Sequence, residues 1–203
     1  MRTKQLFPVL TMILILQACS STKVMDRWKD AGYDKGPAAS LFVIGTLKNR
    51  GPRGLMEEAL AKELRSRGLR ATASTSVFPG EALPTRDEVS AKVTELGCDG
   101  VLVLRFLGRE SGDTHTPERL YGAQPDFDET WENARAATPD TITPEVSYEF
   151  TTAVMRTMLY RVGSDKPVWS VLSRTKYQND PFKQIAPFAA AIVSQLAGDR
   201  MIK

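Results

Sequence analysis

The sequence has few of the residues that most often carry out chemistry in enzymes. Its 203 residues include one histidine, His115, and two cysteines, Cys19 and Cys98. A zinc site or a Ser-His catalytic pair would have to be built around His115 alone, which lies in a loop-like stretch. The chain also lacks a Gly-x-Ser-x-Gly motif, a cysteine–histidine cluster and a dinucleotide-binding glycine fingerprint. We therefore predict no catalytic residues, no metal and no cofactor, and we expect that the protein is not an enzyme.

The chain has no large surplus of positive charge. It contains 27 Lys and Arg and 24 Asp and Glu, a formal net charge of +3, of which residues 1–18 account for two charges through Arg2 and Lys4. A nucleic-acid-binding domain normally carries a clear basic excess, so we predict no nucleic-acid partner. The main asymmetry is the acidic stretch 111–145, which holds eight Asp and Glu and two Arg.

The apolar run near the N-terminus is too short to span a membrane. It covers residues 6–16, whereas a transmembrane helix needs about 20 apolar residues. The run follows two basic residues and ends in Leu16-Gln17-Ala18-Cys19, which is typical of a secretory signal and resembles the bacterial lipobox. The resemblance implies cleavage after a signal peptide at 1–18 and attachment of a diacylglyceryl group, with palmitate-type chains, to the Cys19 thiol.

Residues 19–38 are predicted to form a lipidated tether of 20 residues. They contain few aliphatic residues, and Trp28 and Tyr33 are the exceptions that we expect to dock the segment onto the domain. In Gram-negative envelopes an aspartate after the lipidated cysteine favours retention in the inner membrane, whereas Ser20 stands at that position here. The expected location is therefore the outer membrane, with the domain facing the periplasm.

Cys98 is left without a disulfide partner in the chain if Cys19 carries lipid. It lies in Gly97-Cys98-Asp99-Gly100, directly ahead of an apolar strand pattern. We favour a buried, inert thiol over a reactive one, because a free cysteine commonly behaves as a small apolar residue.

The rest of the chain alternates between strand and helix patterns. Short apolar runs indicate buried strands, Met56, Leu60 and Leu64 recur at helical spacing, and Thr85 with Glu88 forms a capping box. The predicted elements, in order, are strand 41–44, helix 55–67, strand 69–74, helix 85–96, strand 101–107, strands 146–162 and 167–177, and a helix beginning at Asp180-Pro181. The order β-α-β-α-β-β-β-α favours a single α/β domain over 39–203, with helices packed on a mixed sheet.

A long loop is predicted over residues 108–145, which show neither a helical nor a strand period. A loop of this length is uncommon in a compact domain unless it has a function. It contains Tyr121, Phe127 and Trp131, and exposed aromatic side chains often anchor partners. These three are the predicted partner-binding residues; the alternative is that they fold back over the sheet.

Two further patterns resemble ligand-binding sites, but we interpret both as solvent-exposed loops. Asp126, Asp128, Glu129 and Glu132 could supply oxygen ligands to calcium, but their spacing departs from the EF-hand pattern, so we expect a solvated acidic loop. Residues 45–54 resemble a phosphate-binding loop, with glycines and bases ahead of a helix. They lack the Gly-Lys-Ser/Thr of a P-loop, so we expect a flexible turn with solvated bases.

Taken in order, these residues resemble a family of bacterial envelope lipoproteins whose molecular role is not established. The resemblance rests on Trp28-Lys29-Asp30 with Tyr33 and Gly36, Phe42–Gly45, Glu57–Leu60 with Leu64 and Gly68, Asp99–Val103, and Lys166–Ser170. The order of elements is also similar to the amino-terminal domain of TolB, to curli-secretion lipoproteins and to lipoprotein activators of peptidoglycan synthases. The resemblance implies a domain that binds partners or assembles into rings, without enzymatic activity.

The sequence therefore predicts a lipid-anchored, non-enzymatic lipoprotein that binds or scaffolds another envelope component. Its expected partners are the membrane, through lipid on Cys19, and an envelope protein or a second copy of the chain. The alternative is a self-assembling subunit of a secretion or pore complex. Residues 146–162 alternate only in part between apolar and polar, whereas membrane-spanning strands alternate throughout. We therefore rank this alternative second.

Overall fold

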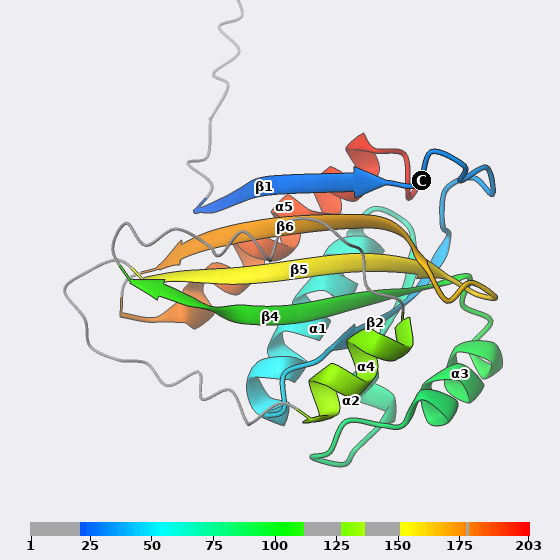
Figure 1. The fold of residues 1–203 in the computed structure, drawn as a ribbon, viewed down its shortest axis with the longest axis horizontal. Helices are drawn as coiled ribbons and strands as arrows, with labels where there is room; N and C mark the ends of the chain where they lie inside the picture. The colour runs from blue at the N-terminus through cyan, green and yellow to red at the C-terminus, as the bar shows by residue number, and fades with distance from the viewer. Residues whose placement is uncertain (1–20, 112–126, 137–150, 178) are drawn as a thin grey trace, which may run out of the picture.

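A six-stranded mixed sheet with the order β1-β6-β5-β4-β2-β3 forms the centre of the protein (Figure 1). The computed structural model describes residues 21–111, 127–136, 151–177 and 179–203. In chain order the elements are β1 (Thr22–Lys29), β2 (Ser40–Gly45), α1 (Arg50–Ser66), β3 (Arg70–Ala73), α2 (Ser74–Val77), α3 (Arg86–Glu95), β4 (Gly100–Ser111), α4 (Phe127–Ala136), β5 (Thr151–Arg161), β6 (Pro167–Tyr177), the 3₁₀-helix η2 (Pro181–Gln184) and α5 (Ile185–Gly198). The predicted α/β class with a mixed sheet is confirmed.

The parallel part of the sheet consists of β3, β2 and β4. β2 pairs in parallel with β3 on one side and with β4 on the other, and all six of its residues are buried. A strand buried on both faces reads as a continuous apolar run, which is why its position was predictable. α1 begins at Arg50, five residues before the predicted start, because Pro52 lies in the first turn, where helices tolerate proline.

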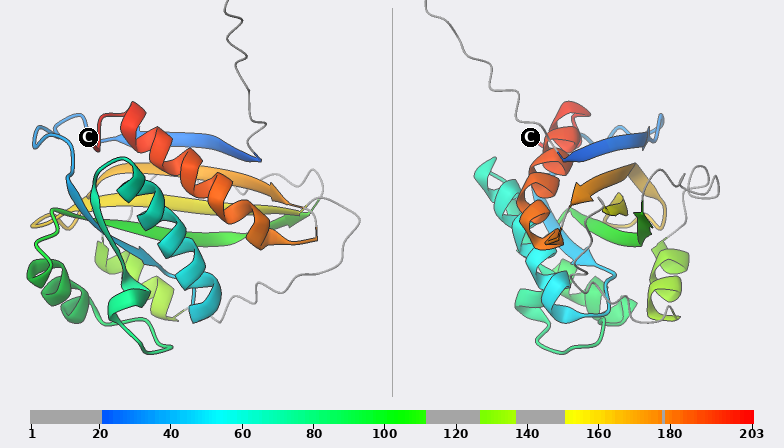
Figure 2. Two further views of the ribbon diagram at one scale, coloured as in Figure 1. Left: turned by 180° about the vertical axis from the view of Figure 1, so that it is seen from behind. Right: turned by 90° about the vertical axis from the view of Figure 1, so that its left-hand side faces the viewer.

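The central strands send alternate side chains into two separate cores. α1 and α5 cover one face of the sheet, and α4 lies on the other (Figure 2). On the first face Leu41, Val43 and Leu102 pack in one cluster with residues of α1 and α5, such as Leu60 and Ile192. On the second face the cluster contains Phe42, Ile44, Val101, Val103, Val89, Val93, Phe127 and Trp131.

The antiparallel part of the sheet is built on the long hairpin of β5 and β6. β5 pairs with β4 as well, from Gly100↔Arg161 to Ser111↔Thr151. The predicted hairpin is confirmed for these strands, while residues 146–150 of the predicted first strand lie outside the described part. Asp180 accepts a hydrogen bond from Phe182 N at 2.9 Å, so the predicted helix start is also confirmed, with a 3₁₀ first turn ahead of α5.

The prediction of a tether over 19–38 is wrong for Thr22–Lys29, which form β1. β1 is an edge strand that pairs antiparallel with β6, from Thr22↔Thr175 to Lys29↔Trp169. The strand was missed because only one of its faces contacts the domain and because the register shifts between Val24 and Asp26, which breaks the alternation of apolar and polar residues.

The prediction of a continuous loop over 108–145 is also wrong. β4 continues through Ser111, and α4 occupies Phe127–Ala136. The alternation of apolar and polar residues did not predict the end of β4, because the register shifts between Phe106 and Gly108. Gly108 has a φ of 141°, which other residues rarely adopt. The bulge moves the following side chains to the opposite faces.

Gly100 of β4 pairs with β2 on one side and with β5 on the other. A substitution there tests how closely these three strands pack. A Cβ at Gly100 would lie 2.9 Å from Tyr160 O and 3.0 Å from Leu41 Cδ2. We expect Gly100→Ala to lower the free energy of unfolding in urea by about 1–3 kcal/mol, because the backbone of β5 must shift. The control is Gly198→Ala, where a Cβ meets no atom within 4 Å. Equal stability of the two variants would contradict the packing described.

Candidate functional site

An apolar pocket lies where β4, β5 and β6 meet the N-terminal ends of α1 and α5. It is open to solvent, and its volume of about 570 Å³ includes the solvent space at its mouth. The lining side chains come from four parts of the chain: Pro52 and Met56 of α1, Phe106 and Arg109 of β4, Ala153, Met155, Thr175 and Tyr177 of the hairpin, and Pro181, Phe182, Gln184, Ile185 and Phe188. The surface they present is almost wholly apolar, which suits an aliphatic or aromatic group more than a charged substrate.

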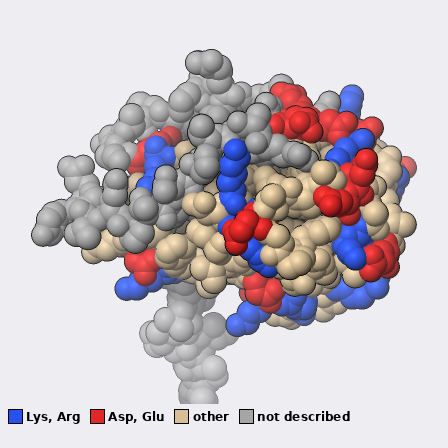
Figure 3. All heavy atoms as spheres, turned by 90° about the horizontal axis from the view of Figure 1, so that it is seen from below, with Lys and Arg blue, Asp and Glu red and all other residues tan. Residues whose placement is uncertain are grey.

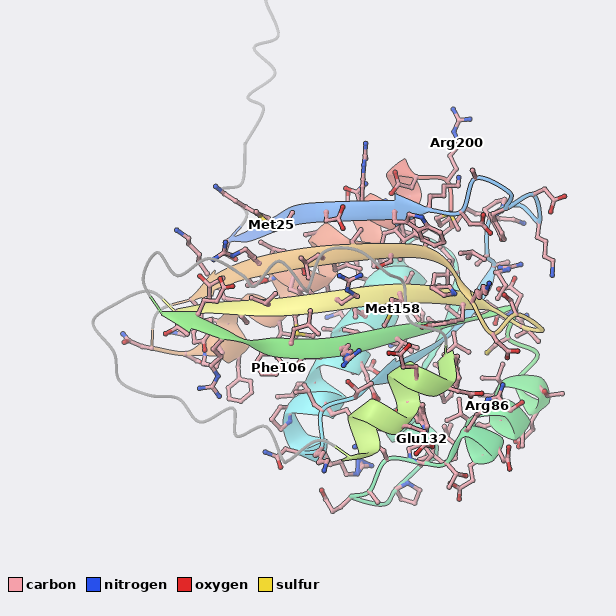
Figure 4. All side chains as sticks on the ribbon, in the orientation of Figure 1. Met25, Arg86, Phe106, Glu132, Met158 and Arg200 are labelled. Carbon is pink, nitrogen blue, oxygen red and sulfur yellow. The ribbon has the colours of Figure 1, made fainter. Side chains whose placement is uncertain are left out.

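The sheet and the end of the hairpin fix the shape of this pocket. Phe106 and Met155 pair directly across β4 and β5, so their side chains stand on the same face of the sheet. Phe106 lies in the same half of the sheet as Met25 of β1 (Figure 4). Phe182 lies at the rim with 37% of its side chain exposed, and its backbone N–H is held by the Asp180 carboxylate. A large apolar side chain is thus kept at the opening instead of filling the pocket.

The first described residues of the chain are fastened to the wall of the apolar pocket. Ser21 Oγ donates a hydrogen bond to Gln184 Oε1, and Lys176 N donates to Ser21 O at 2.9 Å. The hydroxyls of Thr22 and Thr175 are 2.9 Å apart in a buried hydrogen bond. Gln184 and Thr175 both line the pocket, so β1 begins at its edge.

A second hollow lies between α3, the start of α4 and the turn that joins β5 to β6. Its empty volume is about 670 Å³. Its lining is mixed. The apolar residues are Val89, Val93, Val101, Phe127, Tyr160 and Val162, and the polar ones are Arg86, Ser90, Thr94, Arg161, Ser164 and Asp165. Thr22 pairs with Thr175, eight residues from the start of β6 at Pro167, so this hollow lies about 26 Å along the sheet from the beginning of β1.

Arg86 joins the elements around the second hollow. Its guanidinium contacts Asp128 Oδ1 at 2.6 Å and Asp165 Oδ1 at 2.9 Å, and Figure 4 shows it at the start of α3, near α4. Phe127 N donates to Asp165 O at 2.8 Å. Arg86 and Asp165 are both well exposed, so these ion pairs add little to stability but set the rim's shape.

Of the two alternatives for the predicted aromatic residues, the two that the structure describes fold back over the sheet and are not exposed for partner binding. The exposed fraction is 7% for Phe127 and 1% for Trp131, whose rings stack with centroids 5.5 Å apart. Trp131 Nε1 donates to Pro84 O at 3.1 Å. The two residues are one helical turn apart, so they share the face of α4 that packs on the sheet. Tyr121 lies outside the described residues.

The expectation of solvated bases in residues 45–54 is wrong for Arg50 and Arg53. Arg53 is buried, and its guanidinium donates to Leu47 O and Glu81 O, both at 3.2 Å. Arg50 donates to Pro79 O at 3.1 Å and to Thr75 O at 2.8 Å. The guanidinium groups of Arg50 and Arg53 thus hold the backbone around and after α2 against the start of α1. They have a structural role and are not arranged to bind a phosphate.

Glu57 is a structural residue that the sequence pattern did not reveal. Its carboxylate is fully buried and accepts hydrogen bonds from Gly45 N, Ser74 Oγ and Thr75 N, each at 2.8 Å. Burial raises the pKa of Glu57, while these hydrogen bonds oppose the rise. The only available signal was its position four residues after Arg53 and three before Leu60, on the inner face of α1.

The other predicted residues that the structure describes do not form a metal-binding or catalytic cluster. Asp128, Glu129 and Glu132 are exposed, and no group of three possible metal-ligating residues occurs within the described ranges. Cys98 is buried as predicted, and burial raises the pKa of its thiol. On the face shown in Figure 3 acidic and basic side chains are mixed instead of forming a patch of one sign.

Several predicted residues lie outside the part of the chain that the structure describes. They are residues 1–18 of the predicted signal peptide, Cys19, His115 and Asp126. Among the helices of the described ranges, none is both long enough and apolar enough to cross a membrane.

Comparisons with known proteins found similar structures only. No protein-family model matches the chain, and no curated protein matches it. The PelC dodecamer from Paraburkholderia phytofirmans superposes with a TM-score of 0.47 at 12% identity, covering 86% of this chain and 96% of that chain, and a point variant of it superposes similarly, at 0.48. Lipoprotein GNA1162 from Neisseria meningitidis gives 0.40 at 16% identity, covering 79% and 99%. Likeness at this level does not indicate a shared function.

The buried carboxylate of Glu57 predicts a large effect of its removal. Glu57→Ala would leave two backbone N–H groups and one hydroxyl without their acceptor, at about 1–3 kcal/mol for each buried group. We expect a loss of more than about 3 kcal/mol in urea unfolding at pH 7. The neighbouring Glu58, which is exposed and paired with Arg65, is the control, and Glu58→Ala should cost at most about 1 kcal/mol. Losses of similar size would show that Glu57 is not a structural centre.

Proposed function

We propose that the protein is a lipid-anchored, non-enzymatic protein of the cell envelope that holds a partner close to the membrane. The observation that carries this proposal is the place where the chain joins the sheet. Ser21 is already bonded to β6 and η2, and only Ser20 separates it from Cys19, the expected site of acylation. A lipid on Cys19 would therefore hold the domain directly against the bilayer, in the outer membrane on its periplasmic side.

The non-enzymatic part of the proposal is supported by the lining of the two hollows. Among the described residues, neither hollow is lined by a histidine or a cysteine, the side chains that most often act as base and nucleophile. The two terminal nitrogens of Arg53 and the carboxylate of Glu57 already hydrogen-bond to groups of the fold. Binding is the activity that this arrangement supports best.

The second hollow is the surface that we propose for the partner, another protein of the envelope. Its lining combines buried apolar residues with polar and charged ones, and protein interfaces combine both kinds of residue. Val162 at its edge exposes 48% of its surface. Since the hollow lies at the end of the sheet opposite the beginning of β1, a partner could reach it while the domain rests on the membrane.

Self-assembly through sheet edges is less well supported. β1 is an edge strand, but it carries Lys23, Arg27 and Lys29 and a register shift, and such features oppose pairing of a free edge with another strand. β3, at the other edge, has only four residues. We therefore keep a secretion or pore subunit as the second candidate.

The lipid anchor predicts a clear difference between the two cysteines. In cells fed labelled palmitate, Cys19→Ser should abolish incorporation of label into the protein and move it from the membrane to the soluble envelope fraction. The matched control is Cys98→Ser, which should leave both properties unchanged because Cys98 is buried in the domain. Labelling of the Cys19→Ser protein would contradict the proposed anchor.

The partner surface predicts contacts at one end of the sheet. A photo-crosslinking amino acid at Val162 should give one discrete adduct with another envelope protein in living cells. The same group at Leu55, which is 54% exposed on α1 and outside both hollows, should not give this adduct. Adducts between two copies of the chain at Val162 would favour self-assembly instead. The same crosslinked products at Val162 and at Leu55 would show that the second hollow is not the partner surface.

A further inference from the structure

We propose that the apolar pocket beside β1 is the site of one acyl chain carried by Cys19 when the protein is away from the bilayer. This inference deepens the proposed function and rests on its lipid anchor. It assigns the pocket a ligand of defined chemistry, a saturated hydrocarbon chain. It also assigns the ligand's source, which is the N-terminus of the same molecule.

The lining of this open pocket suits part of a hydrocarbon chain. Phe106, Met155 and Phe188 line it, together with Met56 of α1, and its surface is almost wholly apolar. Ligand pockets for larger molecules combine such surfaces with several placed polar groups that fix orientation. Arg109 is the only charged side chain among the described lining residues, so the pocket is fitted to a group that needs shape and apolar contact.

The start of the chain brings the acyl group to this pocket. Ser21 is bonded to Gln184, and Thr22 is bonded to Thr175, and both partners line the pocket. Two residues span about 7 Å at most, so the Cα atom of Cys19 lies within about 7 Å of that of Ser21. A palmitoyl chain extends well beyond this distance. This pocket is adjacent to the residues that hold the start of β1, and its lining is almost wholly apolar. The second hollow lies about 26 Å along the sheet and is lined by charged side chains such as Arg86, Arg161 and Asp165.

Occupancy of the pocket has a physical consequence for an exported lipoprotein. An acyl chain in water is strongly driven to any apolar surface, whereas an acyl chain in a bilayer gains little by moving to a pocket. The same site would therefore be filled while the protein is in aqueous surroundings and would empty on insertion into the membrane. The pocket thus shields part of the lipid without opposing anchoring.

The first experiment measures access to the pocket in two forms of the chain. The acylated mature protein and the Cys19→Ser protein are transferred to detergent-free buffer and titrated with the fluorescent fatty acid cis-parinaric acid. We expect the Cys19→Ser protein to bind one probe molecule and the acylated protein to bind it at least tenfold more weakly. Equal affinity, or no binding by either form, would overturn the inference.

Two substitutions in the Cys19→Ser background locate the bound probe. Ala153 lines the pocket from β5, and Ala153→Phe should fill it and abolish probe binding. Leu55→Phe adds the same ring on exposed α1 outside the pocket and should leave binding unchanged. Circular dichroism and the unfolding midpoint confirm that each variant is folded. Retained binding in a folded Ala153→Phe variant would overturn the assignment.

A second measurement identifies the source of the acyl chain. A palmitate analogue with a photoreactive diazirine is incorporated at Cys19 in cells, and the purified protein is irradiated in detergent-free buffer. The expected product is an intramolecular adduct on the peptide that contains Phe182 or on the one that contains Met56. Adducts that join two molecules would overturn the inference in favour of a second copy. If the intact mass shows no acyl group on Cys19, the proposed anchor itself fails, which distinguishes the two proposals.

Discussion

The complete burial of β2 is the constraint on which the rest of the structure depends. A strand with parallel partners on both sides and apolar side chains on both faces must be covered twice. One cover is made by α1 and α5, which come from opposite ends of the chain, and the other by α3 and α4. The two cores force helices onto both faces of the sheet and leave its longer, antiparallel half to extend beyond them.

That extension produces the two hollows and their separation. The apolar pocket forms where the helices α1 and α5 end before the strands do, and the second hollow forms where the hairpin turn passes α3. The two hollows differ in chemistry because different residues surround them. Apolar side chains of the sheet line the first, whereas the ion pairs of Arg86 lie beside the second. One domain therefore has an almost wholly apolar pocket beside the beginning of β1 and a hollow of mixed polarity toward the opposite end of the sheet.

The sequence was informative where one local signal dominated. The apolar runs of β2 and β4, the capping box of α3 and the Asp180-Pro181 start predicted elements that the structure confirms, because each depends on neighbours in the chain. β1 could not be predicted, since its partner β6 is more than 140 residues away and its own pattern is broken by a bulge.

The candidate site was harder to predict than the fold. The pocket combines side chains from α1, three strands, η2 and α5, and no spacing within the sequence brings these together. The aromatic residues Phe127 and Trp131 were interpreted as exposed because they lie among acidic residues, but their spacing of four places both on the buried face of α4. Burial of Glu57 was equally hidden, since a carboxylate on a helix is usually solvated.

The pairing of β1 with β6 also determines the order of events as the protein is made. The hydroxyl pair of Thr22 and Thr175 joins residues 153 positions apart, and contacts of such separation form late because closing a long loop costs entropy. The first strand of the sheet in sequence is thus among the last to be placed in it. The hairpin of β5 and β6 must form before β1 has an edge to pair with, so the sheet is completed by its most amino-terminal strand.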